Sequence, residues 1–130
     1  MQTLHGCFDL LHPGHISLLR HAAKTADRLV IGLNSDASVR RLKGISRPLQ
    51  SVDKRATALA HFDMVDAVTV FDQNTPQSLI ALLQPDFIVK GGDHNPDDVV
   101  GSDIVKKRGG NVVIAPTLAN FATSKLVKNL

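Results

Sequence analysis

The chain has few of the residues that cross-link a small domain or stack against nucleic acid bases. Of its 130 residues only Cys7 is a cysteine, which excludes an internal disulfide and is typical of a reducing compartment. Trp and Tyr are absent, and Phe occurs only five times. A groove that binds single-stranded nucleic acid by stacking is therefore not expected.

Long hydrophobic runs and a strong excess of one charge are also missing. No apolar run approaches the roughly 20 residues that cross a bilayer. The first apolar stretch is interrupted by Asp9 and His12, unlike a signal peptide. The net charge is only +3, from 15 basic and 12 acidic residues. We therefore expect one cytoplasmic domain, residues 1–130, that binds a small anionic ligand and neither nucleic acid nor a membrane.

Two patterns alternate along the rest of the sequence. Short runs of branched apolar residues are typical of strands buried on both faces of a sheet, and apolar residues at helical spacing lie between them. This alternation predicts an α/β fold, a Rossmann-like three-layer sandwich with a parallel five-stranded sheet. The predicted strands cover 2–7, 28–33, 67–71, 86–90 and 111–115, and the predicted helices cover 14–24, 51–62, 76–83, 101–108 and 123–130.

The clearest motif joins the first predicted strand to the first predicted helix. Ligands of such sheets bind beyond the carboxyl ends of the strands, where this motif lies. Gly6 and Gly14 permit a ligand to approach the backbone, and the start of the helix presents free N–H groups to an anion. His12 and His15 are three residues apart and can both donate hydrogen bonds to a phosphate. These residues predict an anion site.

Other interpretations of the same residues remain open. The two histidines can cap or pack at the helix end without binding any ligand. A pair with this spacing can also bind zinc, although Asp9 is its only additional support and no pair of cysteines is present. The fingerprint G-x-G-x-x-G is absent from this turn, which disfavours a dinucleotide site.

The order of these residues leads to a family resemblance. The run Gly6–Asp9, followed by His12–His15, resembles the signature of the cytidylyltransferase-like nucleotidyltransferases. Further segments, in the same order along the chain, resemble the branch of that family that makes ADP-heptose. They are Asn34–Ser38, Arg41–Gly44, Ser46–Pro48 and Lys90–Asp93, together with Thr123-Ser124, which resembles a closing motif of the family.

The resemblance implies a reaction and its participants. ATP and D-glycero-β-D-manno-heptose 1-phosphate would give a nucleotide-sugar and pyrophosphate, with Mg²⁺ as cofactor, and a homodimer is the assembly that relatives often form. His12 and His15 would contact the triphosphate and stabilise the transition state, and Lys43, on a flexible stretch, would close over the phosphates. Contacts with nucleotide or substrate are implied for Gly6, Cys7, Phe8, Asp9, Gly14, Asn34, Arg55, Lys90, Gly91, Gly92, Asp93, Thr123 and Ser124, and Asp9 is also implied as a Mg²⁺ ligand.

Three positions depart from the family pattern. His5 stands where relatives usually have a small polar residue, and it adds a potential cation beside the phosphates or alters the selection of the sugar. Phe121 and Ala122 replace the residues expected before the Thr-Ser pair. Two alternative functions remain: the same chemistry with CTP and glycerol 3-phosphate, or a non-catalytic nucleotide-binding module.

Overall fold

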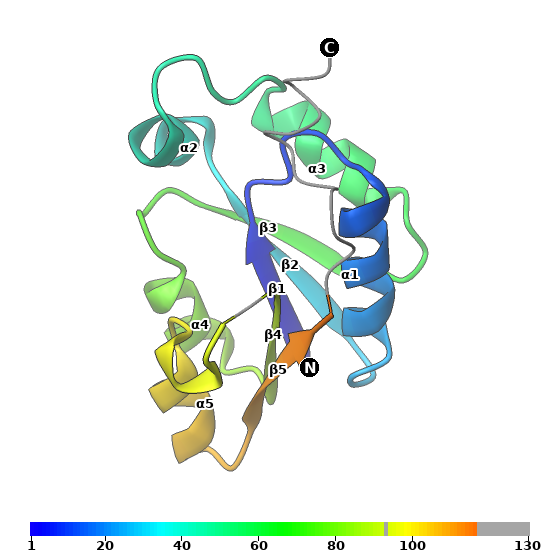
Figure 1. Ribbon diagram of the computed structural model, residues 1–130, viewed down its shortest axis with the longest axis vertical. Coiled ribbons are helices and arrows are strands. Elements are labelled where there is room, and N and C mark those ends of the chain that lie inside the picture. The colour runs from blue at the N-terminus through cyan, green and yellow to red at the C-terminus, as the bar shows by residue number, and fades with distance from the viewer. Residues whose placement is uncertain (93, 117–130) are drawn as a thin grey trace.

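The computed structural model describes residues 1–92 and 94–116. Within these residues five strands form one sheet in which every neighbouring pair is parallel, in the order β3-β2-β1-β4-β5 (Figure 1). The first strand of the chain therefore lies at the centre of the sheet, with its carboxyl end between those of β2 and β4. The strands are β1 (Gln2–Gly6), β2 (Leu29–Asn34), β3 (Ala67–Phe71), β4 (Phe87–Gly91) and β5 (Asn111–Ala115).

Helices cover both faces of this sheet, which confirms the predicted fold class. In Figure 1, α1 and α3 lie on one face, α4 and α5 lie on the other, and α2 lies beyond the carboxyl ends of the strands. Each face has its own buried cluster: Leu19 of α1 packs with Leu4, and Ile80 of α4 packs with Ile88. The helices are α1 (Pro13–Ala23), α2 (Asp36–Lys43), α3 (Val52–Ala60), α4 (Gln77–Leu83) and α5 (Ser102–Lys107), with a 3-10 turn, η1 (Pro96–Asp98).

The predicted elements differ from the observed ones mainly by the omission of α2. The other described strands and helices begin and end within two residues of the predicted limits. The signal for α2 is present in the sequence, because Ser35 accepts a hydrogen bond from the Ser38 backbone N–H (3.1 Å) as an N-cap and Asp36 lies in the first turn. Lys43 therefore lies in the last turn of a helix, which corrects the prediction of a flexible stretch. The predicted helix 123–130 lies outside the described residues.

None of the helices in residues 1–92 and 94–116 is long and apolar enough to cross a bilayer.

Candidate functional site

The turn between β1 and α1 has a conformation that places the Phe8 ring between two motif residues. Phe8 has a positive φ of 46°, which is uncommon for a residue other than glycine. Its ring lies against Gly6, where an added Cβ would come within 3.0 Å of the ring, and 5.3 Å from the ring centroid of His15. Gly6 is therefore required for the packing of Phe8, and Phe8 in turn supports His15.

His12 is the N-cap of α1. Its Nδ1 accepts hydrogen bonds from the backbone N–H groups of Gly14 (3.1 Å) and His15 (3.3 Å), and its carbonyl accepts one from Ile16 (3.1 Å). Because Pro13 has no N–H, the first turn of the helix retains no free donor, which corrects the expectation of free amides at this end. The cap also sets the tautomer. Since Nδ1 accepts, the proton of neutral His12 lies on Nε2, which is the donor nitrogen of the ring.

His12 and His15 form a stacked pair of imidazoles. Their ring centroids are 3.8 Å apart and the ring planes differ by 22°. Burial lowers the pKa of His12, and burial, with the adjacent His12 and Lys43, lowers the pKa of His15 to about 4, although the Leu10 carbonyl acts in the opposite direction. Both rings are therefore neutral at pH 7. A polyanion placed against them would raise both pKa values, because an opposite charge favours the protonated ring.

These pKa values predict how stability depends on pH. The pKa of His5 is also about 4, so His5 and His15 both titrate well below the ordinary value of 6.5. Between pH 6.5 and 4 the unfolded chain binds protons that the folded chain does not, and the free energy of unfolding must fall as the pH is lowered. Urea unfolding at pH 7.5, 6 and 5 measures this slope. The variants His5→Leu and His15→Ala should each reduce the slope, and a slope unchanged by both would contradict the prediction.

Asp9 holds the segment that follows α2. Its carboxylate is buried and accepts hydrogen bonds from the backbone N–H groups of Leu49 (2.8 and 2.7 Å) and Gln50 (2.9 Å). The guanidinium of Arg47 lies 3.6 Å from the same carboxylate. Both oxygens of Asp9 are thus engaged by N–H donors. The implied role of Asp9 as a Mg²⁺ ligand stays a prediction, and this geometry does not favour it.

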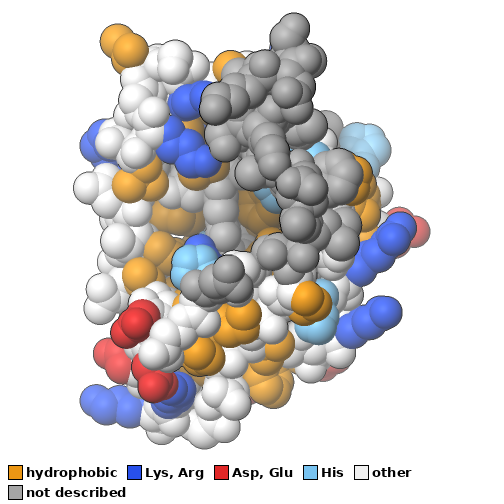
Figure 2. Space-filling view, in the orientation of Figure 1, with side chains coloured by type: hydrophobic (Ala, Val, Ile, Leu, Met, Phe, Trp, Pro, Cys, Tyr) orange, Lys and Arg blue, Asp and Glu red, His pale blue; other side chains and the backbone are white. Residues whose placement is uncertain are grey.

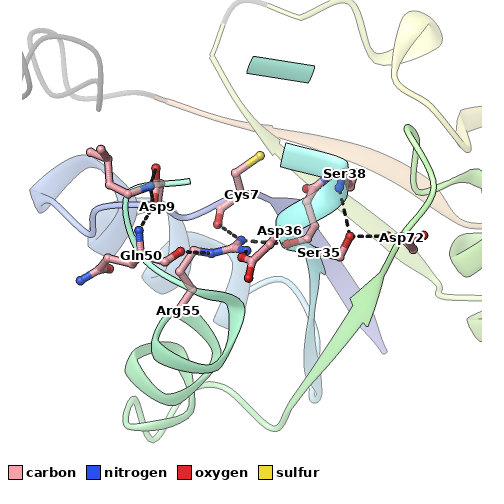
Figure 3. A network of polar contacts seen from close by, with 10 residues as sticks. Cys7, Asp9, Ser35, Asp36, Ser38, Gln50, Arg55 and Asp72 are labelled. Carbon is pink, nitrogen blue, oxygen red and sulfur yellow. Dashed lines mark hydrogen bonds and ion pairs between the residues drawn. The ribbon is translucent and has the colours of Figure 1, made fainter. Parts of the chain in front are cut away.

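Arg55, from α3, joins four segments around the turn (Figure 3). Its side chain is 1% exposed. Nε donates to the Gln50 carbonyl (3.0 Å), and Nη1 donates to the carbonyls of Cys7 and Asn34 (2.8 Å each). Nη2 pairs with the carboxylate of Asp36 at 2.7 Å. Four of the five donors of the guanidinium are therefore used inside the protein, and the implied direct contact of Arg55 with nucleotide stays a prediction.

The start of α2 is held to the loop after β3, by contacts that the sequence analysis missed. The Asn34 side chain donates to Ser38 Oγ (3.1 Å), and Ser38 Oγ donates to the Gln73 carbonyl (2.8 Å). Ser35 Oγ donates to the Asp72 carboxylate (2.6 Å), as Figure 3 shows. Asn34 lies at the carboxyl end of β2, as predicted, but its side chain is directed into the protein. Its contact with nucleotide stays a prediction.

Cationic side chains surround the turn. The charge of Lys43 lowers the pKa of His15, and the charges of Lys43 and Lys90 also act on Cys7, so both ammonium groups lie near the motif. Burial nevertheless raises the pKa of the Cys7 thiol, which leaves it protonated and a poor nucleophile at pH 7. Figure 2 shows a hollow on this face of the molecule, with Lys and Arg side chains gathered near α2.

The structure therefore brings most of the predicted site together at one end of the sheet. The β1–α1 turn with its two histidines, Lys43 at the end of α2, Arg55 in α3 and Lys90 at the end of β4 all lie there. Gly91 ends β4, and Gly92 follows it with a positive φ of 96°. The predicted contacts of Asp93, Thr123 and Ser124 lie outside the described residues. In the described part of the chain no group of three His, Cys, Asp or Glu side chains is placed to bind a metal ion.

A parallel sheet with an H-x-G-H turn at the end of its central strand defines a nucleotide-binding α/β protein. Residues 3–124 match the cytidylyltransferase-like family, and the chain belongs to this family of nucleotidyltransferases. The predicted resemblance and enzyme class are thereby confirmed.

Individual relatives have similar sequences and folds. The chain is 57% identical over 125 residues to the bifunctional protein HldE of Rhodospirillum rubrum, and 53% identical over 122 residues to that of a Caulobacter species. These alignments cover 96% and 94% of this chain but 25% of each relative, so the chain spans about a quarter of their length. A lipopolysaccharide core biosynthesis protein from Thermoplasma volcanium has a similar structure, with a TM-score of 0.72 and 26% identity over 90% of this chain and 94% of that one.

Proposed function

We propose that this chain is an adenylyltransferase that joins ATP to D-glycero-β-D-manno-heptose 1-phosphate and releases pyrophosphate. The observation that carries the proposal is the stacked pair of His12 and His15, beside Lys43, at the carboxyl end of the central strand. The sugar is supported by the segments that resemble the ADP-heptose branch and by the identity to HldE proteins. The similarity to a lipopolysaccharide core biosynthesis protein supports the same assignment.

The chemistry needs positioning and charge stabilisation rather than a protein nucleophile. An oxygen of the sugar phosphate attacks the α-phosphorus of ATP, the bond from that phosphorus to the bridging oxygen breaks, and pyrophosphate leaves from the opposite side. The attacking oxygen is already deprotonated at pH 7, so no strong general base is required. The protonated, half-buried Cys7 agrees with a reaction that forms no covalent intermediate on the enzyme.

The two histidines and Lys43 supply the stabilisation in this proposal. Nε2–H of His12, fixed by the cap, donates to a phosphate oxygen, and His15 donates beside it. As negative charge develops on the departing pyrophosphate, the rings become more basic and hold a proton more strongly. Lys43 is exposed at the end of α2 and reaches the same oxygens as a point charge.

Mg²⁺ fits this proposal as an ion that arrives with the triphosphate. Such an ion would need few protein ligands beside the phosphates, and it would offset their charge when bound. The described residues offer no cluster of ligands for it, and the Asp9 carboxylate is occupied by backbone N–H groups. The residues of this chain therefore act on the phosphates directly.

A substrate panel tests the proposal. Purified protein with Mg²⁺ would be given ATP, CTP or GTP, each with heptose 1-phosphate or glycerol 3-phosphate, and pyrophosphate release would be measured. We expect the highest kcat/KM with ATP and heptose 1-phosphate. Preference for CTP and glycerol 3-phosphate would assign the alternative substrates. Binding of ATP without pyrophosphate release with either acceptor would contradict an enzymatic role.

Lys43→Ala should impair turnover with little effect on stability. Lys43 is exposed, so its removal breaks no buried contact, and the free energy of unfolding should change by less than about 0.5 kcal/mol. The loss of a cation at the phosphates should lower kcat/KM at least tenfold. Steady-state kinetics and urea unfolding measure the two effects, and Lys54→Ala, an exposed lysine of α3, is the matched control. A large loss of stability would instead make Lys43 structural.

A further inference from the structure

His5 is a half-buried imidazole whose Nε2 has no hydrogen-bond partner among the described residues. It is the fourth residue of the central strand and precedes Gly6 at the carboxyl end. The buried atom is Nε2, for which the structure of residues 1–92 and 94–116 shows no donor or acceptor. An unpaired polar atom inside a protein costs free energy, so its presence calls for an explanation other than stability.

The ring of His5 occupies the space that a side chain at Gly32 would take. His5 is paired with Gly32 of β2, and a Cβ added to Gly32 would lie 2.4 Å from Cδ2 of His5 and 3.1 Å from Leu79 of α4. The ring also meets Phe71 edge-on, with centroids 6.5 Å apart. His5 therefore lies on the α4 side of the sheet, whereas α1, with His12 and His15, covers the opposite side.

The sequence suggested that His5 adds a positive charge beside the phosphates, but its surroundings keep the ring uncharged. Burial, together with the charge of nearby Lys90, lowers the pKa of His5 to about 4, so the ring is neutral at pH 7. A neutral imidazole has one donor and one acceptor, so it can pair with a hydroxyl group, which also donates and accepts. Its outer torsion is soft and no hydrogen bond holds the ring, so a nitrogen can turn toward a ligand without backbone movement.

The two sides of the β1 end therefore suit the two substrates. The proposed triphosphate site uses the α1 side, and the second substrate must approach from elsewhere for in-line attack. On the α4 side Lys90 provides a cation for a phosphate and His5 provides a hydroxyl-binding group beside it. We propose that His5 is a specificity-determining residue whose ring hydrogen-bonds a hydroxyl of the sugar phosphate that Lys90 attracts. This inference rests on the proposed function.

The test replaces His5 with Leu, which has a similar size and no nitrogen. We expect KM for heptose 1-phosphate to rise at least tenfold, KM for ATP to stay within twofold, and the urea midpoint not to fall. The matched control is Thr3→Val, because Thr3 is two residues earlier on the same strand and its hydroxyl is also buried without a partner. That control should leave both KM values unchanged. An unchanged KM for the sugar phosphate in His5→Leu, or an equal rise in Thr3→Val, would overturn the inference.

A second variant covers the case in which His5→Leu does not fold. Gly32→Ala keeps both nitrogens but displaces the ring, because the new methyl group overlaps its present position. The same selective rise in KM for the sugar phosphate is expected, and equal rises in both KM values would overturn the inference. Failure of the proposed function looks different, because the wild type would then release no pyrophosphate with heptose 1-phosphate. If the wild type consumes another phosphorylated acceptor, the KM for that acceptor is compared between His5→Leu and the wild type. An unchanged KM would then overturn the role of His5.

Discussion

His15→Ala is expected to lower kcat about 100- to 1000-fold, the usual effect of removing one preorganised donor to developing charge. His15 stacks on His12 and packs against Phe8, at the position where the triphosphate is proposed to bind. The fold should survive, because the substitution breaks no hydrogen bond of the buried His15 Nδ1, which has no partner of normal geometry. The cap of α1 is provided by His12 and is retained. Single-turnover measurement of pyrophosphate release would isolate the chemical step.

The control for this experiment is His21→Ala, in the last turn of the same helix. It removes an imidazole from α1 at a position remote from the motif and should leave kcat within twofold. Far-ultraviolet circular dichroism would show whether α1 stays folded in both variants. Turnover of His15→Ala within twofold of the wild type would remove this residue from the mechanism.

Among the variants proposed here, Arg55→Ala is expected to lower the free energy of unfolding the most. The substitution removes a buried guanidinium and leaves the carbonyls of Cys7, Asn34 and Gln50 without their donor. It also leaves the carboxylate of Asp36 without its ion-pair partner. Each buried hydrogen-bonding group left without a partner costs about 1–3 kcal/mol, and three carbonyls and the half-buried carboxylate of Asp36 are affected here. The loss is therefore a large part of the roughly 5–15 kcal/mol that holds a typical domain folded. Urea unfolding followed by circular dichroism measures the change.

Two further variants define the origin of this effect. Arg55→Lys keeps the charge, but a single ammonium group lacks the planar fork that reaches several carbonyls, so most of the stability should still be lost. Arg40→Ala removes an exposed arginine of α2 and should change the free energy of unfolding by less than about 0.5 kcal/mol. If Arg55→Ala lost less than about 1 kcal/mol, the buried contacts would not be important for stability.

The parts of the fold that follow from local pattern were predictable from the sequence. The strands are apolar at nearly every position because both faces are buried, so their number and parallel direction could be inferred. The same rule placed His12 and His15 at the carboxyl end of β1. The capping interpretation of His12 is confirmed, because its Nδ1 accepts hydrogen bonds from the first turn of the helix, and its contact with the triphosphate stays a prediction.

What the sequence could not show depends on contacts between distant segments. Arg55 bonds to carbonyls 48, 21 and 5 residues away, and a backbone carbonyl leaves no trace in the side-chain pattern. The neutral state of His5 likewise depends on burial under α4 and on Lys90, which is far along the chain. The helix α2 was missed because its short buried face consists of Ser38 and Val39, which is too small to give a clear periodic signal.

The attachment of the segment after α2 has a consequence for divergence and for protein engineering. Asp9 holds this segment through the backbone amides of Leu49 and Gln50, and Arg55 holds it through the carbonyl of Gln50. Every amino acid except proline has a main-chain N–H, so apart from Arg47, whose guanidinium lies 3.6 Å from Asp9, the side chains of this stretch can vary without loss of the attachment. Residues 44–50 can therefore be exchanged between homologues as a cassette, provided that Asp9, Arg47 and Arg55 are retained.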